Sequence, residues 1–209
     1  MMNLILMGCP GAGKGTQSAK LKEKFNLTHI STGDVLRAEM ASGSALGKQV
    51  AGLINQGNLV PDELMIAMLE KIISTTQKGI ILDGFPRTVA QAQALGTLLE
   101  KYHRTLRQVV MIDLPEAEVV KRLSTRRVCR KCGKLAQNAT QTVCPCGGEY
   151  YTRADDTPQS VKHRLEVYRT STLPVKNFYE HSGKYVEING NQMPDQVFKD
   201  ICNVLEKVK

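Results

Sequence analysis

The sequence predicts an α/β protein organised around a doubly wound parallel sheet of five strands. Short apolar segments without polar alternation occupy residues 4–7, 27–30, 79–83, 109–114 and 185–188. Strands of this kind are typical of parallel sheets that are buried on both faces. Longer segments with helical patterns separate them, and right-handed crossovers then place helices on both faces of the sheet. The 209 residues allow one main domain with small inserted lobes.

The helices alternate with the strands along the chain. The helical segments are 14–25, a glycine-containing stretch from 31 to about 55, 61–73, 88–102, 115–127, 157–181 and 193–208. Pro61 stands in a first turn, where a missing N–H costs least. Pro174 lies inside the long segment 157–181 and should kink or interrupt it. The cysteine-rich segment 128–148 breaks the alternation, which indicates an insertion between two core helices.

Composition narrows the class of partner and the compartment. The formal charge of +8 favours polyanions such as nucleic acid, acidic lipid or phosphorylated metabolites. The N-terminal apolar run is short and has no basic segment before it, and no apolar run approaches the ~20 residues of a membrane span. We therefore expect a cytoplasmic protein, and in that reducing compartment clustered cysteines more often bind metal than form disulfides.

A glycine-rich phosphate loop is the strongest motif. The sequence "GCPGAGKGT", residues 8–16, follows a predicted strand and opens a predicted helix. In this context backbone N–H groups and the helix N-terminus surround a phosphate. The phosphate-binding residues are therefore expected to be Gly11, Ala12, Gly13, Lys14, Gly15 and Thr16. Gly15 stands where most such loops have the hydroxyl that ligates Mg²⁺, so a Mg²⁺ ion held mainly through water is expected.

Further motifs extend this pattern over essentially the whole chain. They are "STGDVLR" at 31–37, "GNLVPDEL" at 57–64, "LDGFPRTVAQAQAL" at 82–95 and "TRADD" at 152–156. Together with the phosphate loop they resemble the nucleoside monophosphate kinases, and specifically the long bacterial adenylate kinases. The resemblance implies a core formed by residues 1–30, 61–126 and 157–209, an AMP-binding region at 31–60 and a lid at 127–156. It also implies reversible phosphoryl transfer from ATP to AMP, giving two ADP.

The resemblance assigns roles to individual side chains. It implies that Arg37 and Arg87 grip the AMP phosphate and that Arg126, Arg153 and Arg164 clamp the transferring group. Asp83, at a strand end, would hold Mg²⁺ through water. The implied catalytic set is Lys14, Asp83, Arg87, Arg126, Arg153 and Arg164. Besides the phosphate loop, the implied ATP contacts are Arg122, Arg126, Leu135, Ala136 and Gln192. The implied AMP contacts are Thr32, Arg37, Asn58, Leu59, Val60, Gly84, Phe85, Pro86, Arg87, Gln91, Arg153 and Arg164.

The acceptor base is expected to be adenine. The resemblance places the Thr32 hydroxyl and the Gln91 amide on it, and relatives acting on pyrimidine monophosphates have "SAG" rather than "STG". Thr88-x-x-Gln91 also fits a helix capping box, so Gln91 has a second interpretation. A CMP or UMP kinase is the alternative within the same class of enzyme.

Four cysteines in the implied lid indicate a structural metal site. Cys129-x-x-Cys132-Gly133 has the spacing of a zinc knuckle. Cys144-Pro-Cys146 is one residue tighter than the family usually shows. We expect one structural Zn²⁺, because a lid this small cannot bury a core of its own. Free thiols, or disulfides under oxidising stress, remain alternatives.

The lid also departs from the family at the donor base. The family usually has an aromatic residue followed by His near residues 136–137, whereas this chain has Leu135-Ala136-Gln137. This departure leaves open how strictly ATP is preferred as donor.

A zinc-ribbon protein that binds nucleic acid is the rival from a different class. It is disfavoured because the basic residues fall inside phosphate-transfer motifs rather than along one aromatic-interleaved stripe. A GTPase is disfavoured by the lack of an N-K-x-D-like sequence. The expected partners are ATP, AMP and ADP, with no nucleic acid and no membrane, and a monomer is expected.

Overall fold

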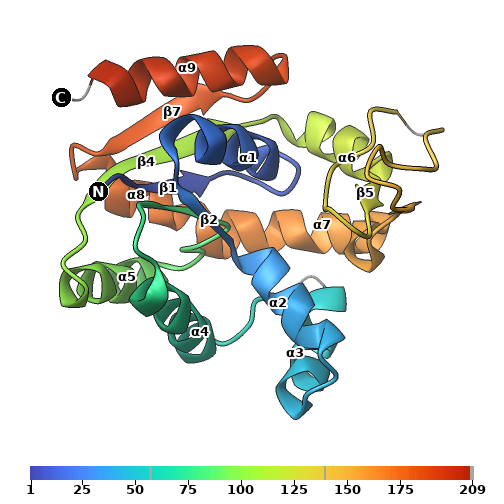
Figure 1. Ribbon diagram of the computed structural model, residues 1–209, viewed down its shortest axis with the longest axis horizontal. Helices are drawn as coiled ribbons and strands as arrows, with labels where there is room; N and C mark the ends of the chain where they lie inside the picture. Colours follow the sequence, from blue (N-terminus) through green and yellow to red (C-terminus); the bar gives the residue numbers. More distant parts are fainter. Residues whose placement is uncertain (57, 139, 208–209) are drawn as a thin grey trace.

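The computed structural model describes residues 1–56, 58–138 and 140–207, and it confirms the predicted fold class. Five parallel strands form one sheet in the order β2-β3-β1-β4-β7 (Figure 1). Their bounds are β1 Asn3–Met7, β2 Thr28–Ser31, β3 Ile80–Asp83, β4 Leu106–Asp113 and β7 Tyr185–Asn189. A second, antiparallel sheet consists of β5 (Val128–Cys129) and β6 (Tyr150–Tyr151). Gly57 and Ala139, which belong to the predicted AMP-binding region and lid, lie outside the described residues.

The helices cover the sheet on both faces. They are α1 Lys14–Phe25, α2 Thr32–Ala41, α3 Ala45–Asn55, α4 Asp62–Thr75, α5 Val89–Lys101, α6 Glu116–Ser124, α7 Pro158–Val167, α8 Pro174–Glu180 and α9 Pro194–Lys207. Alternate residues of β1 enter two different apolar clusters. Ile5 and Met7 belong to the cluster that includes α4, α5 and α8, while Leu4 and Leu6 belong to the cluster that includes α1, α6, α7 and α9. The continuous apolar runs of the sequence reflect this double coverage.

Pro174 interrupts the long helical segment, as predicted. The chain passes from α7 through a π-helical turn, Tyr168–Thr172, into α8, and Pro174 is the first residue of α8. The backbone N–H of Leu173 donates to the Tyr168 carbonyl oxygen at 2.8 Å, a bond that spans five residues. The turn therefore connects α7, whose residues join the cluster with α1, α6 and α9, to α8, whose residues join the cluster with α4 and α5.

Two segments extend away from the sheet (Figure 1). α2 and α3 form a helical pair after β2, and the β5–β6 hairpin with its cysteines follows α6. Among the described residues, no helix combines the length and apolarity needed to span a bilayer.

Candidate active site and cysteine cluster

The phosphate loop joins β1 to α1 at the carboxyl edge of the sheet. Gly8 has a φ of +144°, and a Cβ there would lie 2.5 Å from the carbonyl oxygen of Ile112. Gly13 adopts the left-handed conformation at the N-cap of α1, with a φ of 97°. The Lys14 ammonium donates to the carbonyl oxygens of Gly8 and Cys9, at 2.8 and 2.9 Å. The loop residues Gly11 to Thr16 therefore curl round the N-terminus of α1, as the motif predicts.

Lys14 is held in an environment that disfavours its charge. Burial lowers the pKa of Lys14 to about 8, although the Asp83 carboxylate opposes the shift. Asp83 ends β3 and is 8% exposed, and its Oδ2 lies 3.2 Å from Nε2 of His29. A Cβ on Gly15 would meet Asp83 Oδ2 at 3.7 Å, so the carboxylate lies directly beside the phosphate loop.

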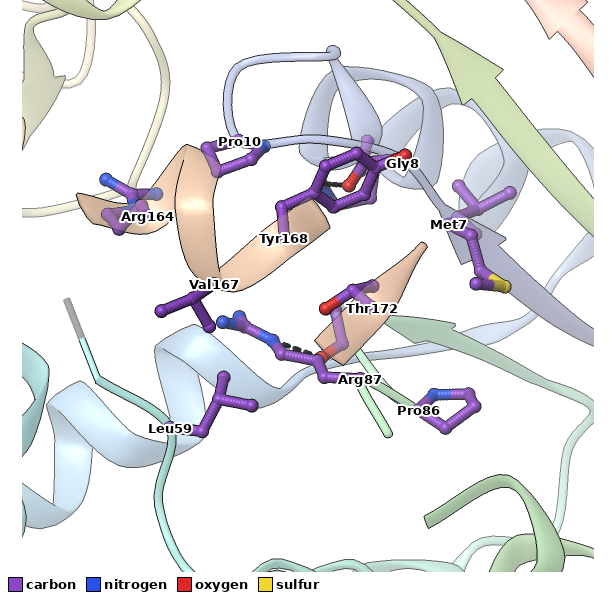
Figure 2. A pocket seen from close by; sticks show the side chains of 13 residues that line it. Met7, Gly8, Pro10, Leu59, Pro86, Arg87, Arg164, Val167, Tyr168 and Thr172 are labelled. Atoms are coloured by element: carbon purple, nitrogen blue, oxygen red, sulfur yellow. Dashed lines mark hydrogen bonds between the residues drawn. The ribbon is translucent and has the colours of Figure 1, made fainter. Parts of the chain in front are cut away.

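A cavity of about 70 Å³ connects the phosphate loop to the loop after β3 (Figure 2). Arg87 comes from that loop, Arg164 and Val167 come from α7, and Leu59 comes from the segment after α3. Small-molecule sites usually occupy ~300–1,000 Å³. The enclosed space is therefore smaller than a whole nucleotide, and its lining joins the phosphate loop to the predicted acceptor residues Leu59 and Arg87.

The guanidinium groups at this site are buried close to one another, which disfavours their positive charge. A bound anion would offset this repulsion. Burial lowers the pKa of Arg87 to about 10, and the neighbouring Arg164 adds to the shift. Burial also lowers the pKa of Arg164, with Arg126 contributing, and that of Arg153, with Arg37 and Arg126 contributing. Cations that depress one another's pKa in a partly buried site are characteristic of anion-binding sites.

Asp156 anchors two of these arginines. Its side chain is inaccessible to solvent, and its Oδ2 accepts from Arg126 Nε at 2.7 Å. Arg126 Nη2 also donates to Oδ1 of Asp156. Arg164 Nη1 donates to the same Oδ1 at 3.2 Å and pairs with Asp155 at 3.1 Å. One buried carboxylate therefore orients both guanidinium groups.

Arg37 belongs to a second group at the start of α2. It donates to Asp34 at 2.5 Å, and Arg153 lies 4.0 Å from the same carboxylate oxygen. Burial pushes the pKa of Asp34 upward, but the bond from Arg37 and the nearby positive charges outweigh it and leave the pKa below its usual value. Asp34 thus brings together two arginines that lie far apart in the sequence.

The predicted adenine-reading side chains are engaged with the protein. Thr32 is buried, and its hydroxyl donates to the carbonyl oxygens of Asp83 and Gly84 at 3.3 and 3.0 Å. Gln91 Nε2 donates to Asp62 at 2.6 Å, and its Oε1 accepts from the Arg87 backbone N–H at 2.7 Å. The Gln91 backbone N–H also donates to the Thr88 hydroxyl, which forms the N-cap half of the capping box, whereas the Gln91 side chain accepts from Arg87 rather than from the Thr88 backbone N–H.

The remaining predicted acceptor residues lie near Arg87. Leu59, Gly84 and Pro86 line the cavity, whereas Phe85 and Val60 are buried in the core. Arg87 Nε donates to the Gly84 carbonyl oxygen at 2.8 Å.

The remaining predicted ATP contacts lie on α6, after β7 and in the β5–β6 hairpin. Arg122 donates to the Gly190 carbonyl oxygen at 3.0 Å. The Gln192 amide donates to the Asn189 carbonyl oxygen and to Asp200, at 2.8 and 3.0 Å. In the hairpin, Leu135 is 48% exposed, and Ala136 packs against the cysteines.

The four lid cysteines converge on one point. Their sulfur atoms all lie within 4.8 Å of one another, and Cys129–Cys146 and Cys132–Cys144 are each 3.5 Å apart. Thiolates about 2.3 Å from a central ion, arranged as a tetrahedron, would be spaced by about 3.8 Å. The donor set and its spacing therefore fit a metal ion, and the tight Cys-Pro-Cys half meets the geometry.

The backbone around the cysteines is arranged to accommodate them. A Cβ on Gly148 would lie 2.6 Å from the Cys129 sulfur, so the chain approaches the cluster too closely for a larger residue. The backbone N–H of Cys146 and the Tyr150 hydroxyl lower the pKa of the Cys144 thiol. The lowered pKa favours a thiolate at Cys144, whereas at Cys132 the Lys134 backbone N–H is outweighed by the neighbouring Cys146, Cys144 and Cys129 thiols together with burial, which raise the pKa of Cys132.

Sequence reasoning missed the residues that orient the predicted ones. Asp156, Asp34 and Asp62 hold arginines or Gln91, and His29 contacts Asp83. Asp34 and Asp156 stand inside the motifs already recognised, so acids beside phosphate-binding arginines were the available signal. The contact between His29 and Asp83 joins neighbouring strands, and no spacing in the sequence indicates it.

Comparison with known proteins agrees with this geometry. The family model described as adenylate kinase matches residues 6–184. The chain is 44% identical to the adenylate kinase of Carboxydothermus hydrogenoformans, in an alignment that covers 99% of this chain and all of the relative. It is 45% identical to the adenylate kinase of Desulfitobacterium hafniense, with 98% of each chain aligned. It is 42% identical to the adenylate kinase of Archaeoglobus fulgidus, with the whole of both chains aligned. The chain therefore belongs to the adenylate kinase family, and its reaction is phosphoryl transfer from ATP to AMP to give two ADP.

Proposed function

We propose that the cations around the cavity perform this transfer by binding the phosphates and neutralising the charge that moves between them. An oxygen of the AMP phosphate attacks the γ-phosphorus of ATP, and the bond from that phosphorus to the β-phosphate oxygen breaks. Such a transfer requires alignment, charge neutralisation and exclusion of water. The observation that carries the proposal is the group of arginines whose pKa values are lowered by burial and by one another.

The cations divide into three roles. Lys14 leaves the carbonyl oxygens of its own loop and binds the β- and γ-phosphates of ATP. Arg37 and Arg87 bind the AMP phosphate. Arg126, Arg153 and Arg164 contact the transferring group, and Arg122 lies on the donor side with Gln192. The planar guanidinium suits this work because it meets two phosphate oxygens at once.

Mg²⁺ with ATP fits the same site. Asp83 lies beside Gly15 at the start of α1, and the donor set there offers a carboxylate but no hydroxyl directly after Lys14. Asp83 would hold the ion through water, and the ion would offset the negative charge of the phosphates. His29 keeps Oδ2 of Asp83 in place.

The acceptor is AMP, and we propose that residues 31–60 form its binding region. Thr32 and Gln91 both form hydrogen bonds to protein groups. Each retains hydrogen-bonding capacity for adenine, because the Thr32 oxygen can still accept and the Gln91 amide has a second N–H and a second oxygen lone pair. Leu59 lines the cavity beside Arg87, and it is placed to contact the same nucleotide.

We further propose that residues 127–156 act as a lid held together by one structural Zn²⁺ on the four cysteines. All four ligands are thiols, which leaves no position for a reacting water. The zinc would replace a hydrophobic core that this short segment lacks. Arg126 and Arg153 flank the segment, so its folding positions them.

Two experiments test the proposed roles. A coupled assay with ATP, Mg²⁺ and a panel of acceptors should show AMP phosphorylated far faster than CMP or UMP, and the reverse order would refute the acceptor assignment. Arg87→Ala and Arg126→Ala should reduce turnover on the order of 10³-fold or more. Wild-type turnover by either folded variant at saturating substrate would remove that arginine from the mechanism.

A further inference from the structure

One face of α7 contacts the segment that leads into the proposed AMP loop. The Ser160 hydroxyl donates to the Asn55 carbonyl oxygen at 3.3 Å. One turn further along the helix, His163 Nε2 lies 2.8 Å from Oδ1 of Asn58. Residues 160, 163 and 167 are spaced by three and four, so Val167 continues the same face. Val167 and Leu59 both line the cavity, as Figure 2 shows.

Asn58 is fixed from three directions. Its backbone N–H donates to the Leu53 carbonyl oxygen at 3.0 Å, and its side-chain amide donates to Gln56 Oε1 at 3.2 Å. Its Oδ1 then remains as the acceptor for Nε2–H of His163. Because the amide nitrogen of Asn58 donates to Gln56, Oδ1 is the atom that faces His163, and His163 is the donor in this hydrogen bond.

We propose that His163 is a positioning residue for the acceptor nucleotide, because its bond to Asn58 holds the following Leu59 at the cavity wall. This inference rests on the proposed role of residues 58–60 in AMP binding. His163 directly precedes Arg164, which lines the same cavity. The bond thus ties the acceptor loop to the helix that supplies a phosphate-binding arginine, and it favours the arrangement that AMP needs.

The bond does not depend on one protonation state of His163. Nε2 carries a hydrogen both in the Nε2–H tautomer and in the imidazolium, and both forms donate to Asn58. The other ring nitrogen lies 3.9 Å from Glu166, and the two side chains are 40% and 66% exposed. An exposed pair of this kind contributes little, so the hydrogen bond to Asn58 carries the effect.

The test compares AMP and ATP binding in matched variants of the whole chain. His163→Ala should raise the KM and the dissociation constant for AMP about two- to tenfold, the range expected for one hydrogen bond. The KM for ATP should stay unchanged. His163→Gln keeps a side-chain N–H donor and should restore most of the AMP affinity. His163→Ala combined with Asn58→Ala should be no worse than the poorer single variant. Glu166→Gln and His181→Ala, at exposed positions, serve as controls without effect on AMP.

Three results would overturn the proposal. They are an unchanged AMP dissociation constant in a folded His163→Ala protein, equal losses of AMP and ATP affinity, and a His163→Gln variant as poor as His163→Ala. Arg37→Ala separates this failure from that of the proposed AMP site. If Arg37→Ala weakens AMP binding and His163→Ala does not, only the role of His163 is wrong. If Arg37→Ala weakens ATP binding instead, the acceptor assignment itself fails.

Discussion

Replacing Asp156 by Asn should disturb both stability and turnover, because this buried carboxylate orients two arginines. Its side chain is fully inaccessible, and it accepts bonds from Arg126 and Arg164. Removing one partner of a buried ion pair costs about 3–5 kcal/mol. Asn keeps the volume and one acceptor oxygen, so we expect a loss of about 3 kcal/mol, at the low end of that range. For a chain of this size, that corresponds to a melting temperature about 6–12 °C lower.

Turnover should fall with the loss of orientation. Misplacement of reacting groups by about 1 Å can cost ~10²-fold in rate, and two arginines are released here. We therefore expect the kcat of Asp156→Asn to fall on the order of 100-fold at a temperature where the variant is folded. Thermal unfolding and a coupled assay measure the two effects.

Asp195→Asn is the matched control for this substitution. Asp195 pairs with Lys20, but its side chain is 91% exposed, so solvent already screens the pair. This variant should melt and turn over like the wild type. A folded Asp156→Asn protein with wild-type melting temperature and kcat would show that Asp156 does not hold the arginines.

Three further predictions follow from the site. The pKa of Lys14 is lowered to about 8, so its charge destabilises the substrate-free fold below that pH. Relative to Lys14→Met, the wild type should gain stability as pH rises from about 8 to about 10.4. Near pH 9, ATP binding should be accompanied by uptake of a proton by Lys14. Calorimetry in buffers of different ionisation enthalpy measures this uptake. Cys144→Ser should abolish bound metal and lower the melting temperature, whereas Cys202→Ser should leave the metal content unchanged. A wild-type protein purified without a tag that holds less than half an equivalent of metal, with four titratable thiols, would refute a metal site. Gly148→Ala should reduce the metal content as well, because its Cβ would lie 2.6 Å from a cysteine sulfur; full metal loading would argue against the close approach.

The fold class and the phosphate loop were predictable because both depend on local patterns. Continuous apolar runs predicted a sheet covered on both faces, and the spacing of the glycines and Lys14 predicted the loop between β1 and α1. Pro174 predicted an interruption because proline lacks the N–H that a continuing helix needs. The π-helical form of that turn accompanies the packing of α7 and α8 into different apolar clusters, which no local pattern encodes.

The sequence by itself determined which residues carry charge, thiol or glycine, and hence the class of chemistry and the spacing of the four clustered cysteines. Only the tertiary structure decided which groups meet. Asp34 joins Arg37 to Arg153, and His163 reaches Asn58, across separations of more than 100 residues. The same chain folding gives Gln91 a partner in Asp62, so its amide is engaged before any base arrives. The physical reason is that hydrogen bonds and desolvation act over a few ångströms in space. Separation along the chain therefore says nothing about them until the sheet has set the distances.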